Sequence, residues 1–188
     1  IHIADVASQV DIDSELDAYA QRRASNLYLP DKTIHMLPTN LSSLCSLGES
    51  EKSSALSVGF RMINCQISDI RILQSEIKVV KMSYEEADQV LKEDQALSKL
   101  NALAEFHKAF RNNNGAIKLD LPNVDVKLKN KKVDIQIQTE SASRKLVAEM
   151  MVIAGRVIAQ YATENKISMP FLAQEVGSFS EEIMQNKE

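Results

Sequence analysis

Apolar and polar residues alternate in several short segments of the chain, the pattern that is typical of β-strands. The most regular segment runs from Ala55 to Ile63, and apolar residues between Ile67 and Val80 predict its antiparallel partner. The opening of the chain, up to about Val10, is also strand-like. Further strands are expected later, the last two joined by a Lys/Asn turn: Ile117–Leu119, Val124–Leu128 and Val133–Ile137.

Apolar positions three or four residues apart predict the helices. A helix from Ser14 to Asn26 has Ser14 as its N-cap. Ser83 and Glu86 form the capping box of a second helix that ends near Leu91. A longer helix is expected from about Gln95 to Asn113, with an apolar stripe along one side.

The clearest helix runs from about Ser143 to Thr163, and apolar residues occupy more than half of its circumference, so we expect it to be buried. The segment from Tyr28 to Pro38 contains two prolines and is expected to be an extended loop. A short helical turn or coil follows from Leu41 to Leu47. Together these elements predict an α+β domain with a mixed sheet and packed helices.

Composition narrows the choice of function. The chain has 188 residues and a formal net charge of −4, which suits one domain or a large part of one. The acidic balance argues against strong nucleic-acid binding by this chain alone, because such proteins usually carry a basic surplus. Cys45 and Cys65 match no zinc or redox pattern and are expected to be reduced and buried. No membrane span is expected, since Glu149 and Arg156 interrupt the most apolar helix.

Few residues suggest chemistry by themselves. His2, His35 and His107 are far apart in the sequence, and each is better explained by its strand, loop or helix than as a metal ligand. Asp5 lies in an apolar strand, so its carboxylate must be paired, hydrogen-bonded or near a metal, and a buried hydrogen-bonding anchor is the simplest interpretation. Asp5 alone therefore does not indicate a metal site.

Arg22 and Arg23 lie late in their helix and are followed by Tyr28. Two guanidinium groups near an aromatic ring can bind a phosphate and stack on a base. The same two cations can equally complement the C-terminal end of a helix. Both interpretations remain open, and the residues alone support only an α+β domain of undetermined function.

The first 47 residues contain a series of short motifs at characteristic spacing: His2–Val6, Leu16-Asp17, Arg22-Arg23, Tyr28–Pro30, Met36–Pro38, Leu41-Ser42 and Leu44–Leu47. This series resembles the catalytic RNB domain of the RNase II / RNase R family. The resemblance extends to about residue 172 through looser matches, which are Ala55–Ser57, Tyr84, Gly115–Ile117 and Arg144–Met151. The sequence of Val147–Met151, followed by Pro170-Phe171, most resembles the cyanobacterial and plastid branch of the family.

The resemblance implies a 3′→5′ exoribonuclease that threads single-stranded RNA to a Mg²⁺ site and releases nucleoside monophosphates. The family's Asp-rich metal motif is expected upstream of His2, and its catalytic arginine motif downstream of Glu188. We therefore expect an internal piece of a longer enzyme, with residues 1–174 in the catalytic domain and 175–188 as a polar tail. The complete protein is expected to be a monomer, cytoplasmic or plastid-located, and to bind neither DNA nor membranes.

Site residues also follow from the resemblance. Tyr28 matches a tyrosine that packs on the RNA near the cleavage site, and Tyr84 matches one that lines the catalytic cavity. Leu119 stands where the family often has Phe, so one wall of its base clamp loses an aromatic face. We therefore expect RNA contacts at four residues and catalytic roles for two: Arg22, Arg23, Tyr28 and Leu119 for RNA, Tyr84 and Glu149 for catalysis.

One departure affects how the RNA end is positioned. The family pattern Leu-Val-Glu-Glu reads Leu146–Glu149 here, so Glu149 keeps the second glutamate and Ala148 replaces the first, which points into the cavity. Two other classes of function stay open, namely a non-catalytic RNA-binding or regulatory relative and a structural protein that shares only the fold. An Asp-rich motif encoded just upstream would favour the enzyme, and its absence the binder.

Overall fold

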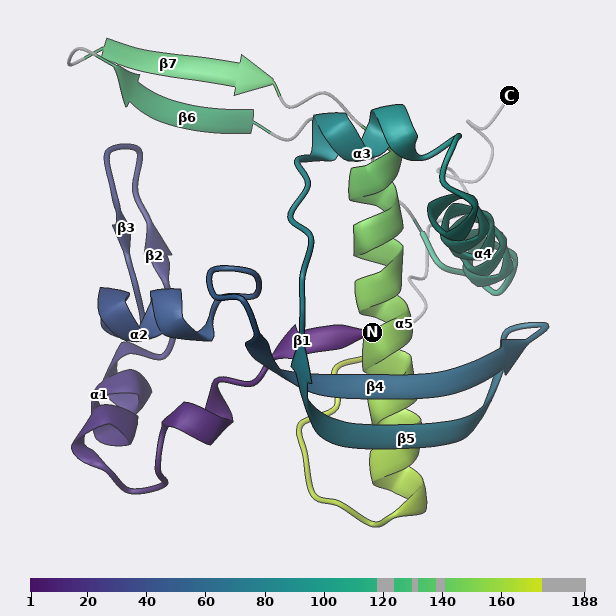
Figure 1. The fold of residues 1–188 in the computed structure, drawn as a ribbon, viewed down its shortest axis with the longest axis horizontal. Helices are drawn as coiled ribbons and strands as arrows, with labels where there is room; N and C mark the ends of the chain where they lie inside the picture. The colour runs from purple at the N-terminus through teal and green to yellow at the C-terminus, as the bar shows by residue number, and fades with distance from the viewer. Residues whose placement is uncertain (118–123, 130–131, 138–140, 174–188) are drawn as a thin grey trace, which may run out of the picture.

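A three-stranded antiparallel sheet packed against one long helix forms the centre of the computed structural model, which describes residues 1–117, 124–129, 132–137 and 141–173. The sheet has the order β1 (His2–Ala4), β4 (Ser53–Ile63), β5 (Gln66–Ile77), and the helix is α5 (Ala142–Glu164). Figure 1 shows α5 crossing β4 and β5. This sheet-on-helix pair positions the rest of the chain.

Residues that face each other across this pair form the main apolar core. Val58 and Ile67 from the sheet and Ile153 and Val157 from α5 make one buried cluster. The β4–β5 hairpin turns through two residues, Asn64 and Cys65, with φ angles of 50° and 61°, as a tight two-residue hairpin requires.

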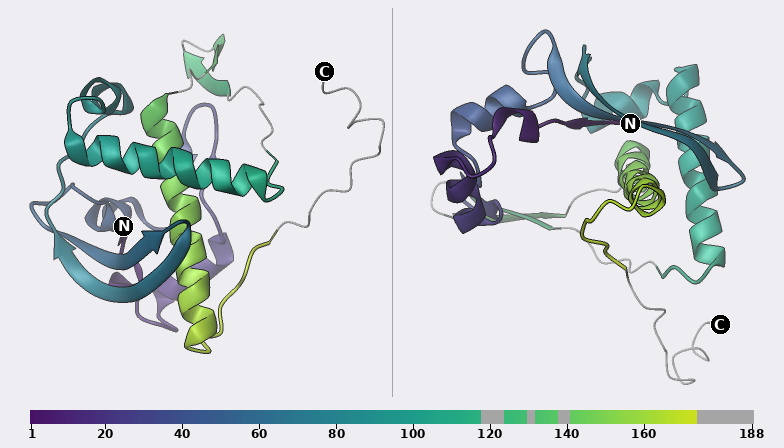
Figure 2. Two further views of the ribbon diagram at one scale, coloured as in Figure 1. Left: turned by 90° about the vertical axis from the view of Figure 1, so that its right-hand side faces the viewer. Right: turned by 90° about the horizontal axis from the view of Figure 1, so that it is seen from below.

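Two further helices pack beside α5. Helix α3 (Tyr84–Val90) lies over its N-terminal end, and α4 (Gln95–Asn113) crosses its side, as Figure 2 shows. A second buried cluster joins them through Leu91, Ala104 and Leu146. The start of α5 is thereby fixed from two directions.

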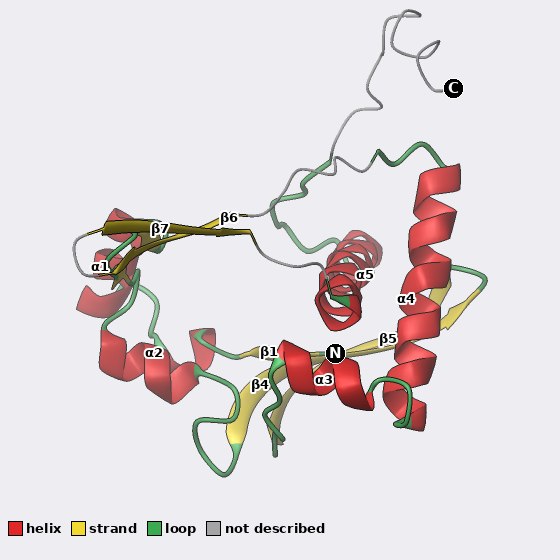
Figure 3. Cartoon of the chain, turned by 90° about the horizontal axis from the view of Figure 1, so that it is seen from above, coloured by secondary structure: helices red, strands yellow, loops and turns green. Residues whose placement is uncertain are grey.

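The remaining N-terminal elements lie to one side of this core, away from α3–α5 in Figures 1 and 3. They are a 3₁₀ turn and four short elements: Ala7–Gln9, α1 (Glu15–Arg23), β2 (Leu27–Tyr28), β3 (Thr33–Ile34) and α2 (Thr39–Cys45). The Ser14 hydroxyl caps α1 by accepting a hydrogen bond from Asp17 N at 3.1 Å. Helix α1 ends at Ala24, which has a left-handed φ of 61°.

A separate hairpin, β6 (Val124–Lys129) and β7 (Lys132–Ile137), lies above β2–β3 in Figure 1. Leu128 N donates a hydrogen bond to the Pro30 carbonyl at 3.0 Å, so the two hairpins touch. The register pairs aliphatic residues on one face of β6–β7, and all six are exposed: Val124, Val126, Leu128, Val133, Ile135 and Ile137.

The predicted α+β class is confirmed, as are both capping motifs, β4, β5, α4 and the core helix. The expected single mixed sheet is instead three separate antiparallel sheets among the described strands. The first strand ends at Ala4 rather than near Val10, because the chain turns into a 3₁₀ helix. The expected loop from Tyr28 to Pro38 instead contains most of the small β2–β3 hairpin, namely the end of β2, the turn and all of β3.

The prediction that the long apolar helix is buried was wrong for one of its faces. Val147 and Met151 on α5 are 43% and 70% exposed, whereas Ile153 and Val157 are fully buried. By length and composition α5 could also span a membrane, but its buried face packs in the core. Most of the expected strand Ile117–Leu119, and the expected tail 175–188, lie outside the described residues.

Candidate RNA-contacting site

Tyr84 is the first residue of α3, and hydrogen bonds fix its backbone. The Ser83 hydroxyl accepts from Glu86 N at 3.1 Å, and Ser83 N donates to the Glu86 carboxylate at 2.7 Å. The Tyr84 carbonyl accepts from the Ser143 hydroxyl at 3.0 Å, while Ser143 N donates to the Asp88 carboxylate at 2.8 Å. The start of α3 is therefore fastened to the start of α5.

The ring of Tyr84 is covered on one face by Arg144, whose guanidinium carbon lies 4.2 Å from the ring centroid. Hydrogen bonds from the Ser143 backbone and side chain hold the pKa of Asp88 below its usual range, so this link between the helices stays charged. Tyr84 remains 36% exposed. This exposure leaves aromatic surface on which a base or ribose could stack.

Glu149 lies at the centre of a buried network. Its Oε1 accepts from His107 Nδ1 at 2.5 Å and from Arg111 Nε at 2.8 Å, and its Oε2 accepts from Arg111 Nη2 at 2.6 Å. His107 Nε2 lies 3.2 Å from Arg156 Nη1, and Arg156 Nη2 donates to the Cys65 carbonyl at 2.9 Å. An arginine N–H can only donate, so Nε2 of His107 accepts and its Nδ1 donates. We call these five residues the Glu149 network.

The electrostatics keep Glu149 ionised. Burial raises the pKa of its carboxyl, but hydrogen bonds from Arg111 and His107, together with the charge of Arg111, outweigh burial and bring the pKa below its ordinary value. Both carboxylate oxygens are occupied by protein donors. The network therefore ties α4, α5 and the β4–β5 turn together, and the catalytic role expected for Glu149 remains a prediction.

Sequence reasoning did not find the partners of Glu149. His107 was interpreted as a helix-face residue, which is where it lies, but Arg111 received no role. The signal that could have indicated a partner was a carboxylate inside a widely apolar helix, because a buried charge requires one. The identity of that partner depends on how α4 crosses α5.

Ala148 lies next to Glu149 on α5 but is exposed. It lines a hollow of about 200 Å³ between the end of α4 and the start of α5, together with Lys108, Arg111 and Lys145. A glutamate at this position would place a carboxylate among these cations. Glu149 also lines this hollow and is paired with Arg111, so Ala148 leaves the hollow with one carboxylate fewer than the family pattern would give.

Tyr28 is 74% exposed in the small β2–β3 hairpin. Its hydroxyl accepts a hydrogen bond from Asn26 Nδ2 at 3.4 Å, and Asn26 Oδ1 accepts from Met36 N at 2.7 Å. The hairpin therefore presents the ring to solvent rather than packing it. Arg22 and Arg23 are exposed in the last turn of α1, and Arg23 stacks over the ring of Tyr19, at 5.2 Å, rather than over Tyr28.

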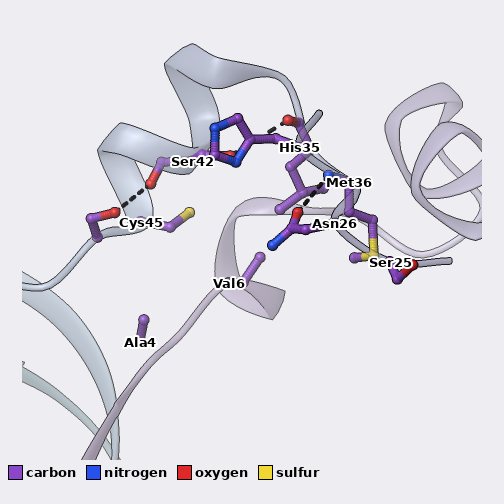
Figure 4. Close-up of a pocket in the computed structure, with 10 residues that line it drawn as sticks. Ala4, Val6, Ser25, Asn26, His35, Met36, Ser42 and Cys45 are labelled. Carbon is purple, nitrogen blue, oxygen red and sulfur yellow. Dashed lines mark hydrogen bonds between the residues drawn. The ribbon is translucent and has the colours of Figure 1, made fainter. Parts of the chain in front are cut away.

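The predicted site residues fall into two separate groups. Arg22, Arg23 and Tyr28 lie in the N-terminal elements, whereas Tyr84 and Glu149 lie on α3 and α5, and Figure 1 shows the two regions apart. A hollow of about 520 Å³ lies among the N-terminal elements. It is bounded by the first strand, Asn26, Met36 and α2, as Figure 4 shows. Leu119 lies outside the described residues.

Metal ligation has no support within the described residues. No group of three or more His, Cys, Asp or Glu side chains in that part of the chain is close enough to hold an ion. Asp5 accepts hydrogen bonds from Ser8 N and Gln74 Nε2, each at 3.2 Å, as expected of a hydrogen-bonding anchor, but it is half-buried and follows β1 rather than lying buried within a strand. The described residues therefore do not fit a Mg²⁺ centre.

The sequence model of the RNB domain family matches residues 1–186 of this chain. The chain belongs to the RNB domain family. Ribonuclease R of Chlamydia trachomatis is 34% identical over 187 residues, covering 93% of this chain and 27% of the relative. An uncharacterized ribonuclease of Synechocystis is 35% identical over 182 residues, with the same two coverages.

Ribonuclease II, chloroplastic/mitochondrial, of Arabidopsis thaliana is 28% identical and covers 93% of this chain. The cyanobacterial and plant proteins agree with the branch expected from the motifs, and the chlamydial enzyme is as similar as the cyanobacterial one. This RNB chain spans about a quarter of the length of these relatives. The activity of the whole protein is therefore a matter for proposal.

Solved structures confirm the RNB fold. RNase R of Mycoplasma genitalium in complex with double-stranded RNA superposes with a TM-score of 0.79 at 24% identity, covering 89% of this chain and 33% of that one. Yeast Ssd1, described as a pseudonuclease, gives a TM-score of 0.59 at 24% identity over 79% of this chain and 20% of that one. The RNB fold thus occurs in a ribonuclease and in a pseudonuclease.

Proposed function

We propose that this chain is part of a 3′→5′ exoribonuclease that degrades single-stranded RNA to nucleoside monophosphates. The observation that carries the proposal is the RNB match over residues 1–186, with named ribonucleases 34% and 35% identical across most of the chain. The solvent-exposed rings of Tyr28 and Tyr84 support RNA contact, since stacking on an aromatic ring contributes about 1–3 kcal/mol per base.

In this proposal the described residues hold and orient RNA, while the hydrolytic metal centre is supplied elsewhere in the protein. The exposed Arg22 and Arg23 would contact phosphates near the Tyr28 ring, and Tyr84 would contact the strand further along. Mg²⁺ would be bound by carboxylates outside the described residues, since the described residues contain no group of side chains that could hold a metal ion. In solution the complete protein would act as a monomer.

The alternative is an RNA-binding relative without nuclease activity. The fold likeness to the yeast pseudonuclease favours it. Both proposals expect this protein to bind RNA, but only the first expects it to cleave the RNA.

One experiment separates them. The longer natural protein that contains this sequence is incubated with a 5′-labelled single-stranded RNA, with Mg²⁺ or with EDTA. An exonuclease shortens the labelled strand stepwise from its 3′ end only when Mg²⁺ is present, and an RNA with a blocked 3′ end serves as the control. Stable RNA binding without any shortening would reject the nuclease in favour of the binder.

A further inference from the structure

Arg144 lies where it can set the orientation of Tyr84, and no role was expected for it. Its guanidinium carbon is 4.2 Å from the centroid of the Tyr84 ring, close enough for strong cation–π attraction. Arg144 follows Ser143, whose hydroxyl and backbone N–H bond to the Tyr84 carbonyl and to Asp88. Backbone and ring of Tyr84 are therefore both held by consecutive residues of α5.

The two faces of the Tyr84 ring have different surroundings, because Arg144 lies over one of them. One face of the ring is covered by a planar cation, while Tyr84 as a whole residue stays 36% exposed. A guanidinium stacked on one face restricts rotation of the ring about χ1 and χ2. It also makes the ring less electron-rich, which favours stacking of an electron-rich base on the opposite face. Without the arginine, the ring could move into the space that the guanidinium fills.

We propose that Arg144 is a positioning residue that holds Tyr84 in the orientation that receives RNA. The proposal rests on RNA being the ligand of this chain, as the proposed function requires, but not on hydrolysis. Arg144 acts through the ring and touches no reacting atom. A contact of this kind corresponds to about two- to thirty-fold in an equilibrium constant.

The test is a double-substitution cycle in the longer natural protein. Arg144→Ala, Tyr84→Leu and the combined variant are compared with the wild type. The two readouts are kcat/KM on single-stranded RNA and the Kd for the same RNA measured in EDTA. We expect Arg144→Ala to raise Kd and lower kcat/KM by about two- to thirty-fold. In the Tyr84→Leu background the same change should have almost no further effect.

Two controls separate positioning from stability. Arg61→Ala removes an exposed arginine that pairs with Asp69 in the β4–β5 hairpin, and it should leave Kd and kcat/KM unchanged. Arg144→Lys keeps the charge but not the planar stack, and it should recover part of the lost affinity, whereas Arg144→Gln should not. Thermal unfolding checks that each variant folds, and if Arg144→Ala does not fold, Arg144→Lys takes its place in the cycle, alone and combined with Tyr84→Leu.

The outcomes are distinct. Effects of Arg144→Ala and Tyr84→Leu that simply multiply, or an unchanged RNA affinity after Arg144→Ala, would overturn the proposal. If the wild type degrades no RNA in Mg²⁺ but the coupled loss of affinity is seen in EDTA, the nuclease proposal fails and the positioning role stands. If hydrolysis is seen but the two substitutions act independently, the nuclease proposal stands and the positioning role fails.

Discussion

Replacing Glu149 by Gln tests whether the Glu149 network holds the fold together. The substitution keeps the shape of the side chain but removes the charge that pairs with Arg111 and that accepts the His107 hydrogen bond. Glu149 is 5% exposed and His107 is fully buried, so neither of these two groups can turn to solvent freely. Breaking a buried ion pair by removing one partner costs about 3–5 kcal/mol. Arg111 is partly exposed, with 34% of its side chain accessible, so we expect a loss near the lower end of that range.

Urea and thermal unfolding, followed by circular dichroism, provide the assay. For a domain of this size, a loss of about 3 kcal/mol corresponds to a drop in Tm of roughly 6–12 °C. The matched control is Glu76→Gln, which removes the acid of the Lys52–Glu76 pair, whose side chains are 69% and 66% exposed. An exposed pair contributes about 0–1 kcal/mol, so this control should lower Tm far less.

Acid provides a second readout of the same network. The folded-state pKa of Glu149 lies below the ordinary value of 4.5, which applies to the unfolded chain. The ionised carboxylate therefore stabilises the native state fully at any pH well above 4.5. The stabilisation is lost progressively as pH falls through the lower, folded-state pKa. The stability gap between the wild type and Glu149→Gln should therefore be constant near neutral pH and narrow below about pH 4.5. A gap no larger than that of Glu76→Gln, or one that does not narrow in acid, would refute the argument.

Four further predictions concern the whole chain and single residues. The 188-residue chain by itself should release no nucleotides from RNA with Mg²⁺ present, since its described residues bring no metal-binding group together; any Mg²⁺-dependent release seen by chromatography would contradict this. Its affinity for single-stranded RNA at physiological salt should be weaker than micromolar by fluorescence anisotropy, because its net charge is −4. In the proposed full-length exonuclease, Tyr28→Ala should lengthen the final product on a sequencing gel with little change in the first cleavages or in Tm, because a residue that is 74% exposed supports binding more than folding; a lowered Tm with unchanged product length would reject this. Ile153→Ala should cost about 2–5 kcal/mol in urea unfolding, whereas Met151→Ala, at a position that is 70% exposed, should cost much less.

Elements with a local start signal were predicted closely. Ser14 and Ser83 cap their helices as expected, because an N-cap depends on residues within one turn. Helix α2 has no side-chain cap and begins after Pro38, so the sequence indicated only a helical turn or coil. The short first strand depends on pairing with β4, fifty residues away, and its end could not be located from its own apolar pattern.

Burial was harder to predict than secondary structure because it depends on what lies across from each face. The apolar positions of α5 occupy most of its circumference, yet only the side toward β4, β5 and α4 is buried. The six aliphatic residues of β6–β7 alternate as a half-buried strand pair should, but their apolar face is exposed. An amphipathic pattern predicts which face can be buried, and the packing partner decides whether it is.

In the site, too, the sequence indicated what depends on neighbouring residues but not what depends on residues far away in the chain. Glu149 and Arg156 were noticed as charges that interrupt an apolar helix, and that observation alone implies partners, since an isolated buried charge is too costly to keep. The partner of Glu149 proved to be an arginine 38 residues earlier, supported by a histidine 42 residues earlier. Both lie on α4, four residues apart, so they share one helix face. Two basic residues at that spacing on a mostly apolar stripe, with an acid inside the next long helix, make the pairing a candidate from the sequence, but the way α4 crosses α5 decides whether they meet.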